Sequence, residues 1–317
     1  MFDQAKQLRR LARNFAQPGR QGRGPRPRLI VVSTGMEKLG ATTVAANVAA
    51  GLSLGRRKTL LIDVDSQNGS IARLCGVKPS HTIADLLSGR RDLTGVIHPG
   101  PVGLDVIPGV RGLEKLSDYP SEAIARLATQ LDLADPDTAF VVLDLGSEMT
   151  DLARRAWEIA DLAVLVSAPD DDPILETYAI IKTMTAKGAV TPIRLVINRA
   201  ADQKSADDIY ARLAHAAKQF LDLRLGTLGW LAEDPMIEAA DRAGNLLAAA
   251  AANCESGRTL RSFAEMIAYE TIGGYQVAEE TSSTKSTRKQ LPPTLTALAE
   301  LLGEPTHVRK TEDSRRA

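Results

Sequence analysis

The sequence lacks several features that would each point to a particular class of protein. Aromatic residues make up 4% of its 317 residues, and its two cysteines, Cys75 and Cys254, lie far apart without a CxxC or histidine-rich context. We therefore expect neither an aromatic nucleic-acid platform nor a disulfide framework nor a zinc site. The formal net charge is zero, so the chain as a whole has no general attraction to nucleic acid or acidic lipid.

Long apolar runs are also missing. No segment approaches the roughly 20 apolar residues that a membrane-spanning helix needs. The N-terminus is basic but has no apolar stretch of the kind found in signal peptides. We therefore expect a cytoplasmic protein with two free thiols.

Between residues 29 and 273, short β-rich apolar runs alternate with helix-like segments. This alternation predicts an α/β domain with a mostly parallel, doubly wound sheet covered by helices on both faces. The predicted strands are Leu29–Ser33, Thr59–Asp63, Leu104–Pro108, Phe140–Leu145, Leu162–Ser167, Ile193–Asn198 and Thr227–Leu231. The predicted helices are Thr42–Leu54, Ser121–Leu131, Met149–Ala160, Ile174–Lys187, Ala206–Phe220 and Thr259–Glu270. Such sheets bind ligands at the carboxyl ends of their strands.

Two tails of different composition flank this domain. Residues 1–28 contain eight Lys or Arg residues and one acid, Asp3, which predicts a basic arm with a flexible Gly/Pro/Arg-rich linker. Residues 274–317 are polar in their first part and predict a flexible tail. Within that tail, Leu295–Leu302 is expected to form a short amphipathic helix that is a candidate for membrane contact.

The segment after the first strand has the frame of a phosphate-binding loop. Gly35, Gly40 and Thr42 match the spacing GxxxxGK[ST], with Ala41 at the lysine position. In an intact loop, backbone N–H groups surround the phosphates, the threonine holds magnesium, and the lysine neutralises phosphate oxygens. Lys38 lies inside the loop and is a candidate substitute for that lysine. Taken alone, such a loop is equally compatible with a turn that binds nothing.

Together with three later segments, this loop resembles the MinD/ParA class of deviant P-loop ATPases. The segments read Leu61-Ile-Asp63-Val-Asp65, Val141-Val-Leu-Asp144 and Leu195-Val-Ile-Asn198-Arg199. The resemblance implies ATP and magnesium as ligands, with Asp65 as the catalytic residue and Thr42, Asp65 and Asp144 at the metal. The nucleotide-binding residues that it implies are Gly35, Lys38, Gly40, Ala41, Thr42, Thr43 and Asn198, the last of these at the adenine.

Within that class, several blocks resemble flagellar-number regulators of the FlhG/FleN type. They include Ser167-Ala-Pro-Asp170 with Glu176–Lys182, and Leu228–Pro235. The N-terminal Asp3-Gln4-Ala5-Lys6-Gln7-Leu8-Arg9 matches DQAxxLR, the arm with which these regulators stimulate the signal-recognition-type GTPase FlhF. The resemblance implies that Asp3, Gln4, Ala5, Leu8 and Arg9 contact this partner and that Gln4 orients a water for phosphoryl transfer. The alternative is a solvated basic helix.

The chain departs from the class at its phosphate loop. Met36 stands where the class has a second lysine that reaches across a homodimer, and Glu37 adds a negative charge. With Ala41, two cations are lost, and each cation–phosphate bond contributes about 1.5–3 kcal/mol. We therefore expect a degenerate ATP site in which hydrolysis is weak or absent.

Three functions are compatible with this sequence. The first is a regulator of flagellar number or placement that acts on the FlhF-type GTPase. The second, which does not exclude the first, is a weakly active MinD-like ATPase with ATP-dependent dimerisation. The third is a pseudo-ATPase scaffold of the TadZ/CpaE kind at the cell pole. A homodimer and peripheral contact with the inner membrane or pole are further candidate properties, and we expect no specific nucleic-acid partner.

Overall fold

The computed structural model of the chain describes residues 26–65, 69–110, 127, 129–131, 135–186, 191–251 and 253–273. The arm up to residue 25, most of the helix predicted for Ser121–Leu131 and the tail from residue 274 lie outside these residues. Cys75 and Cys254 are free thiols, as the sequence predicts. None of the helices that the structure describes has the length and apolar character of a membrane span.

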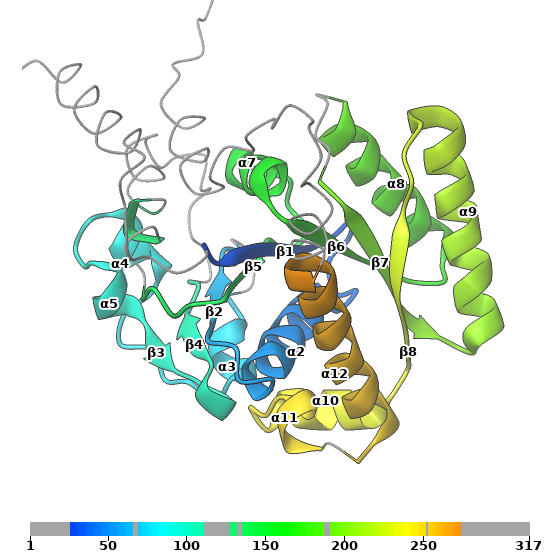
Figure 1. The fold of residues 1–317 in the computed structure, drawn as a ribbon. Helices are drawn as coiled ribbons and strands as arrows, with labels where there is room; N and C mark the ends of the chain where they lie inside the picture. The colour runs from blue at the N-terminus through cyan, green and yellow to red at the C-terminus, as the bar shows by residue number, and fades with distance from the viewer. Residues whose placement is uncertain are drawn as a thin grey trace, which may run out of the picture.

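Eight strands form one sheet in the order β3-β4-β2-β5-β1-β6-β7-β8 (Figure 1). All neighbouring strands are parallel except β3 and β4. The strands are β1 (Arg28–Thr34), β2 (Thr59–Asp63), β3 (His98–Pro99), β4 (Asp105–Ile107), β5 (Phe140–Asp144), β6 (Leu162–Ser167), β7 (Ile193–Ala200) and β8 (Gly226–Ala232). The mostly parallel α/β fold predicted from the sequence is confirmed.

Most of the helices lie between strands along the chain, and α10, α11 and α12 follow β8. The helices are α2 (Ala41–Leu54), α3 (Ile71–Leu74), α4 (Ile83–Leu87), α5 (Leu93–Val96), α7 (Asp151–Ile159), α8 (Asp171–Thr185), α9 (Gln203–Leu221), α10 (Pro235–Arg242), α11 (Leu247–Ala250) and α12 (Glu255–Ala268). A 3₁₀ turn, Pro101–Gly103, and a π-helical turn, Tyr269–Gly273, complete the described elements.

Alternate residues of the central strand β1 pack on opposite faces of the sheet. Val31 belongs to an apolar cluster that includes Trp157 of α7 and Ile181 of α8. Ile30 and Val32 belong to a second cluster with α2, α11 and α12. Figure 1 shows these two groups of helices on either side of the sheet. Because side chains alternate along a strand, covering both faces requires the continuous apolar sequence that β1 has.

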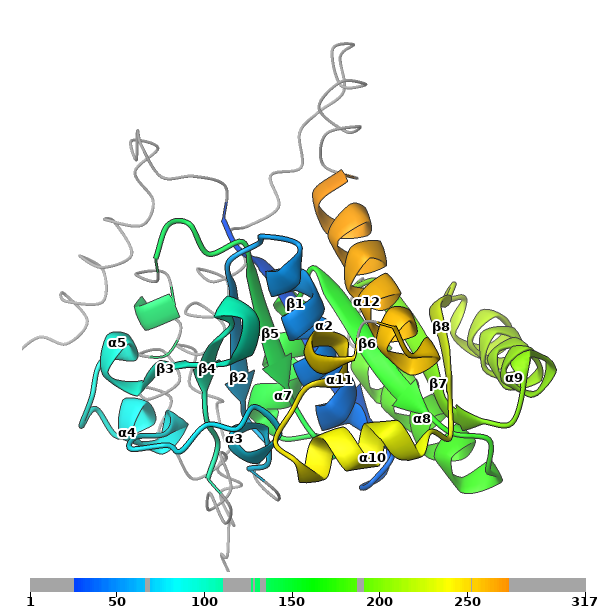
Figure 2. The same cartoon turned by 90° about the horizontal axis from the view of Figure 1, so that it is seen from below.

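All seven predicted strands are present, with ends that differ by at most two residues. The short elements β3, α3, α4, α5 and α10 were not predicted, because segments of this length have too few residues to show a hydrophobic period. Several of them lie where the parallel strands end. Figure 2 shows α3 and α10 side by side at that end of the sheet.

Gly51 allows α2 and α12 to approach closely, because a Cβ at this position would lie 2.7 Å from the Cβ of Ala264. We predict that Gly51→Ala lowers the free energy of unfolding by about 1–3 kcal/mol through overpacking, as measured by urea denaturation. Adding Ala264→Gly removes the opposing methyl group and should recover part of this loss relative to the sum of the single variants. Strictly additive losses would contradict the close contact.

Candidate nucleotide site

The loop between β1 and α2 is shaped by two glycines with different packing demands. Gly40, directly before α2, has a φ of 91°, and a Cβ there would lie 2.5 Å from Asn198 Nδ2. A Cβ on Gly35 would lie 2.6 Å from the Cβ of Glu176 on α8. Both positions therefore need glycine, one for its backbone conformation and one for space. The loop places the N-terminus of the 14-residue helix α2 at the carboxyl end of β1.

A cavity of about 580 Å³ lies over this helix N-terminus. Its volume falls within the range of about 300–1,000 Å³ that is usual for small-molecule sites. The predicted site residues that line it are Lys38, Gly40, Ala41, Thr42, Thr43 and Asp65. Gly35, Asp144 and Asn198 are not among the lining residues. The cavity is also lined by Glu37, Arg73 and Arg199. Neither arginine was predicted to belong to the site.

Three carboxylates lie together at the carboxyl ends of β2 and β5. Asp63 and Asp144 are opposite each other in the parallel register, and both are fully buried. Asp63 accepts hydrogen bonds from the backbone N–H groups of Asp65, at 3.2 Å, and Ile71, at 3.1 Å. Asp65 is 5% exposed. Asp63 therefore organises the turn that presents Asp65 to the cavity.

The two carboxylate oxygens of Asp144 differ in their hydrogen bonding. Its Oδ1 accepts a hydrogen bond of 3.2 Å from Gly146 N–H, whereas its buried Oδ2 has no partner among the described residues. Burial raises the pKa of Asp144 to about 7; the Thr42 hydroxyl opposes this rise, and the negative charge of Asp65 adds to it. Burial, and then the charge of Asp144, also raise the pKa of Asp63 well above its ordinary value.

The donor set fits magnesium. A buried carboxylate oxygen without a partner, a second buried carboxylate and the Thr42 hydroxyl are all hard oxygen ligands, which Mg²⁺ prefers. Among the described residues, no group of three or more His, Cys, Asp or Glu side chains forms a metal site by itself. Mg²⁺ commonly binds through one or two carboxylates together with water and substrate phosphates, which is the arrangement that these residues favour.

Asn198 makes two hydrogen bonds that the sequence did not reveal. Its Nδ2 donates to the carbonyl of Leu39 at 2.8 Å, and its Oδ1 accepts from Arg199 N–H at 3.1 Å. The side chain is 8% exposed and ties the phosphate loop to the end of β7. Its role at the adenine stays a prediction.

The residues of α10 contribute to the same region. Thr43 Oγ1 donates to Asp241 Oδ2 at 2.8 Å, and Arg73 Nη1 donates to the Asp241 carbonyl at 2.8 Å. Burial raises the pKa of Asp241. Asp241 and Arg73 are far from the phosphate loop in sequence, and neither belongs to a recognisable motif, so sequence reasoning could not place them here. The arm residues Asp3, Gln4, Ala5, Leu8 and Arg9 lie outside the described residues.

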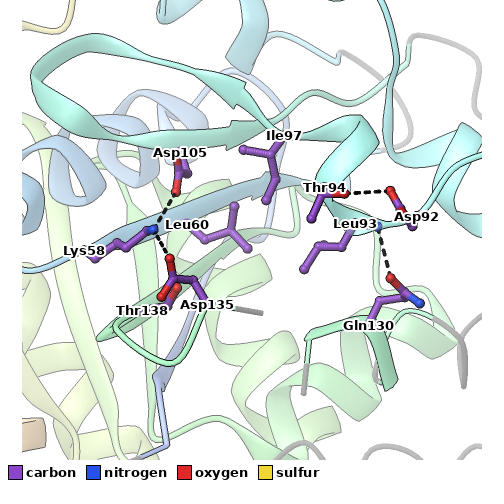
Figure 3. Close-up of a pocket in the computed structure, with 10 residues that line it drawn as sticks. All are labelled: Lys58, Leu60, Asp92, Leu93, Thr94, Ile97, Asp105, Gln130, Asp135 and Thr138. Carbon is purple, nitrogen blue, oxygen red and sulfur yellow. Dashed lines mark hydrogen bonds and ion pairs between the residues drawn. The ribbon is translucent and has the colours of Figure 1, made fainter. Parts of the chain in front are cut away.

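A second cavity, of about 370 Å³, lies near the opposite ends of the strands. Figure 3 shows that its polar groups pair with each other, because Lys58 contacts Asp105 and Asp135, and Gln130 accepts from the Leu93 N–H. Ligands of open parallel sheets bind at the carboxyl ends of the strands. The cavity above α2 is therefore the better candidate for a ligand site.

The chain is similar to known proteins in sequence and in fold. The antiactivator FleN of Pseudomonas aeruginosa is 26% identical over 219 residues, which are 67% of this chain and 76% of FleN. The flagellum site-determining protein YlxH of Helicobacter pylori is 26% identical over 214 residues, which are 67% of this chain and 71% of YlxH. No protein-family model matches the chain.

Among solved structures, the cell-division ATPase MinD of Pyrococcus furiosus aligns with a TM-score of 0.62 at 22% identity, covering 76% of this chain and 98% of that one. MinD of Pyrococcus horikoshii, solved with Mg-ADP, aligns with a TM-score of 0.63 at 20% identity, covering 76% and 96% of the two chains. The chain thus has the fold of these MinD structures, and the loop between β1 and α2 has the frame of a phosphate-binding loop. The curated relatives FleN and YlxH agree with the resemblance to FlhG/FleN-type proteins that the sequence motifs indicated.

The raised pKa of Asp144 gives a testable pH dependence. In the folded protein this carboxyl holds a proton that the unfolded chain releases above its ordinary pKa of 3.8, so stability falls as the pH rises toward about 7. Without metal, Asp144→Asn should raise the melting temperature at pH 8 and flatten its dependence on pH between 5 and 8, with a gain of up to about 4 kcal/mol. Circular dichroism melts in EDTA measure both effects.

The exposed variant Asp208→Asn is the matched control and should melt like the wild type across this pH range. An Asp144→Asn protein with the wild-type pH slope, or with a lower melting temperature at pH 8, would contradict the assignment of a buried, protonated carboxyl.

Proposed function

We propose that this chain is a MinD-like regulator of flagellar number or placement that acts on an FlhF-type GTPase through its N-terminal arm. The observation that supports this most is the combination of two features in one chain. Its P-loop domain has FleN and YlxH as curated relatives. Ahead of that domain stands the sequence from Asp3 to Arg9, which matches DQAxxLR.

We further propose that the domain binds Mg-ATP and hydrolyses it slowly or not at all. Residues Gly40–Thr43 line the cavity, and Thr42, Asp65 and Asp144 offer the oxygen ligands for the metal. When bound, magnesium neutralises phosphate oxygens and orients them for displacement. Ala41 is 4% exposed and supplies no cation at the loop position that normally stabilises the charge formed during hydrolysis. The site is in this sense degenerate.

The remaining parts of the proposal concern assembly and location. MinD-type relatives include one solved in a complex with MinC. For this chain we propose a homodimer, and a cytoplasmic protein with a peripheral position at the inner membrane or the cell pole. A pseudo-ATPase scaffold of the TadZ/CpaE kind would share this location. Counting flagella and pili in a deletion strain separates the two, since a flagellar regulator changes flagellar number and leaves pili unchanged.

The first prediction of this proposal concerns the arm. The full chain should stimulate GTP hydrolysis by the FlhF-type partner by at least roughly tenfold, because a group supplied in trans can complete a phosphoryl-transfer site. Removing residues 1–28, or changing Gln4→Ala, should abolish the stimulation in a phosphate-release assay. Gln7→Ala, at a position that the motif leaves open, is the matched control and should behave like the wild type.

Absence of stimulation by the full-length chain would refute the regulatory proposal, whatever the nucleotide site does. Equal stimulation by the wild type and by the Gln4→Ala variant would show that the arm does not act as proposed.

The second prediction concerns hydrolysis by the chain itself. Ala41→Lys should increase phosphate release from millimolar Mg-ATP by at least roughly tenfold, because the new ammonium group stabilises charge in the transition state. Asp65→Ala in that background should remove the gain. The intact carboxylates favour the second candidate function, a weakly active ATPase. That function would be established instead if the wild type already showed a rate that depends on Asp65.

A further inference from the structure

Three cations from separate elements line the cavity above α2. Lys38 belongs to the loop after β1, Arg73 to α3, and Arg199 to the end of β7. They line the same space as Thr42 and Asp65. The fold thus supplies positive charge from three elements. The two loop positions at which the resemblance leads us to expect lysine are occupied by Met36 and Ala41.

These cations are not used by internal ion pairs in the part of the chain that the structure describes. Lys38 and Arg199 are exposed, and their side chains form no hydrogen bond or salt bridge with another described residue. Arg73 makes one contact, from Nη1 to the Asp241 carbonyl, which leaves further N–H donors of its guanidinium group available. Exposed cations that converge on one cavity and form no salt bridge with a described residue are suited to bind an anionic ligand.

The backbone at two of the cations is strained. Lys38 has a φ of 62° and Arg199 a φ of 58°, both in the left-handed region that residues with a side chain rarely adopt. Such a conformation costs roughly 1–2 kcal/mol and persists where the surrounding structure enforces it, which is most often at functional sites. Lys38 and Arg199 thus combine this backbone conformation with a place in the cavity, whereas Arg56, Val102 and Asp222 have positive φ outside it.

Asn198 connects the two strained positions. Its amide holds Leu39, the neighbour of Lys38, through Nδ2, and holds Arg199 N–H through Oδ1. One buried side chain thus fixes the loop that carries Lys38 and the strand end that carries Arg199. Pre-organised cations bind with less loss of conformational freedom than mobile ones.

The acidic and basic side chains of the cavity are arranged in a way that suits phosphates with a bound magnesium ion. The carboxylates Asp65, Asp63 and Asp144 lie buried at the strand ends, whereas Arg73 and Arg199 are exposed. Glu37 also lines the cavity and opposes an anion there. A metal ion bound to the buried carboxylates would offset their charge and leave the exposed cations free to neutralise phosphate oxygens.

We propose that Arg199 and Arg73, together with Lys38, bind the phosphates of a nucleoside di- or triphosphate in place of the two lysines that the loop lacks. The proposal rests on the nucleotide-binding part of the proposed function and identifies the residues that provide it. Arginine suits this role because its guanidinium stays charged and donates two parallel hydrogen bonds to phosphate oxygens.

Calorimetric titration of the full-length chain with Mg-ATP tests this proposal. Arg199→Gln should weaken ATP binding by about 10- to 100-fold, the effect of one charge-assisted contact, and Arg73→Gln should act in the same direction. Titration with AMP, which has a single phosphate, should show a smaller difference between wild type and variants. The control is Arg91→Gln, an exposed arginine outside the cavity, which should bind ATP like the wild type.

The melting temperature of each variant shows whether a change in ATP binding reflects a loss of folding. The side chain of Arg199 has no described partner to lose, so Arg199→Gln should keep the wild-type melting temperature. Arg199→Gln and Arg73→Gln proteins that bind ATP as tightly as the wild type would overturn the proposal and leave nucleotide binding intact. A wild-type protein that binds no nucleotide at millimolar concentration would overturn this proposal and also the proposed nucleotide binding on which it rests. Stimulation of the GTPase partner is measured in a different assay, so its failure is distinguishable from either result.

Discussion

The parallel pairing of β2 with β5 places Asp63 beside Asp144 inside the protein, and the surrounding structure is arranged around these carboxylates. Burying a carboxylate without a cation is costly, so the pKa values of both rise. Neighbouring residues leave little room, because a Cβ at Gly109 would lie 2.7 Å from Asp63, and one at Gly146 would lie 2.6 Å from Asp65. Such crowding of acids is retained where a bound cation balances their charge.

Cationic residues that line the cavity provide the other half of this charge balance. In a P-loop with its lysines, the loop supplies both the backbone cradle and the cations. In the site that we propose, the loop keeps its backbone frame, and the cations come from Lys38, from α3 and from the end of β7. Nucleotide binding and nucleotide hydrolysis thereby become separable, because Ala41 leaves the loop without its catalytic charge. In the proposed function, the domain binds nucleotide as a signal while the arm acts on a partner.

Much of the fold and half of the site could be predicted from the sequence. The strands were predictable because residues buried on both faces form continuous apolar runs. Asp63, Asp65, Asp144 and the loop glycines were predictable because they stand at fixed offsets from strand ends. Arg73 and Asp241 were not, since only the fold brings their distant segments to the site, and Arg199 was quoted beside Asn198 without a role of its own. The two hydrogen bonds of Asn198 depend on a backbone carbonyl and a backbone N–H group, which no residue pattern reveals.

A crystal structure of the full chain with magnesium and a non-hydrolysable ATP analogue is the most direct test of this charge balance. We predict phosphates above the N-terminus of α2 with Arg199 and Arg73 on their oxygens, and a magnesium ion at Thr42 and Asp144. Phosphates that point away from both arginines, or a crystal without nucleotide at saturating concentration, would contradict it.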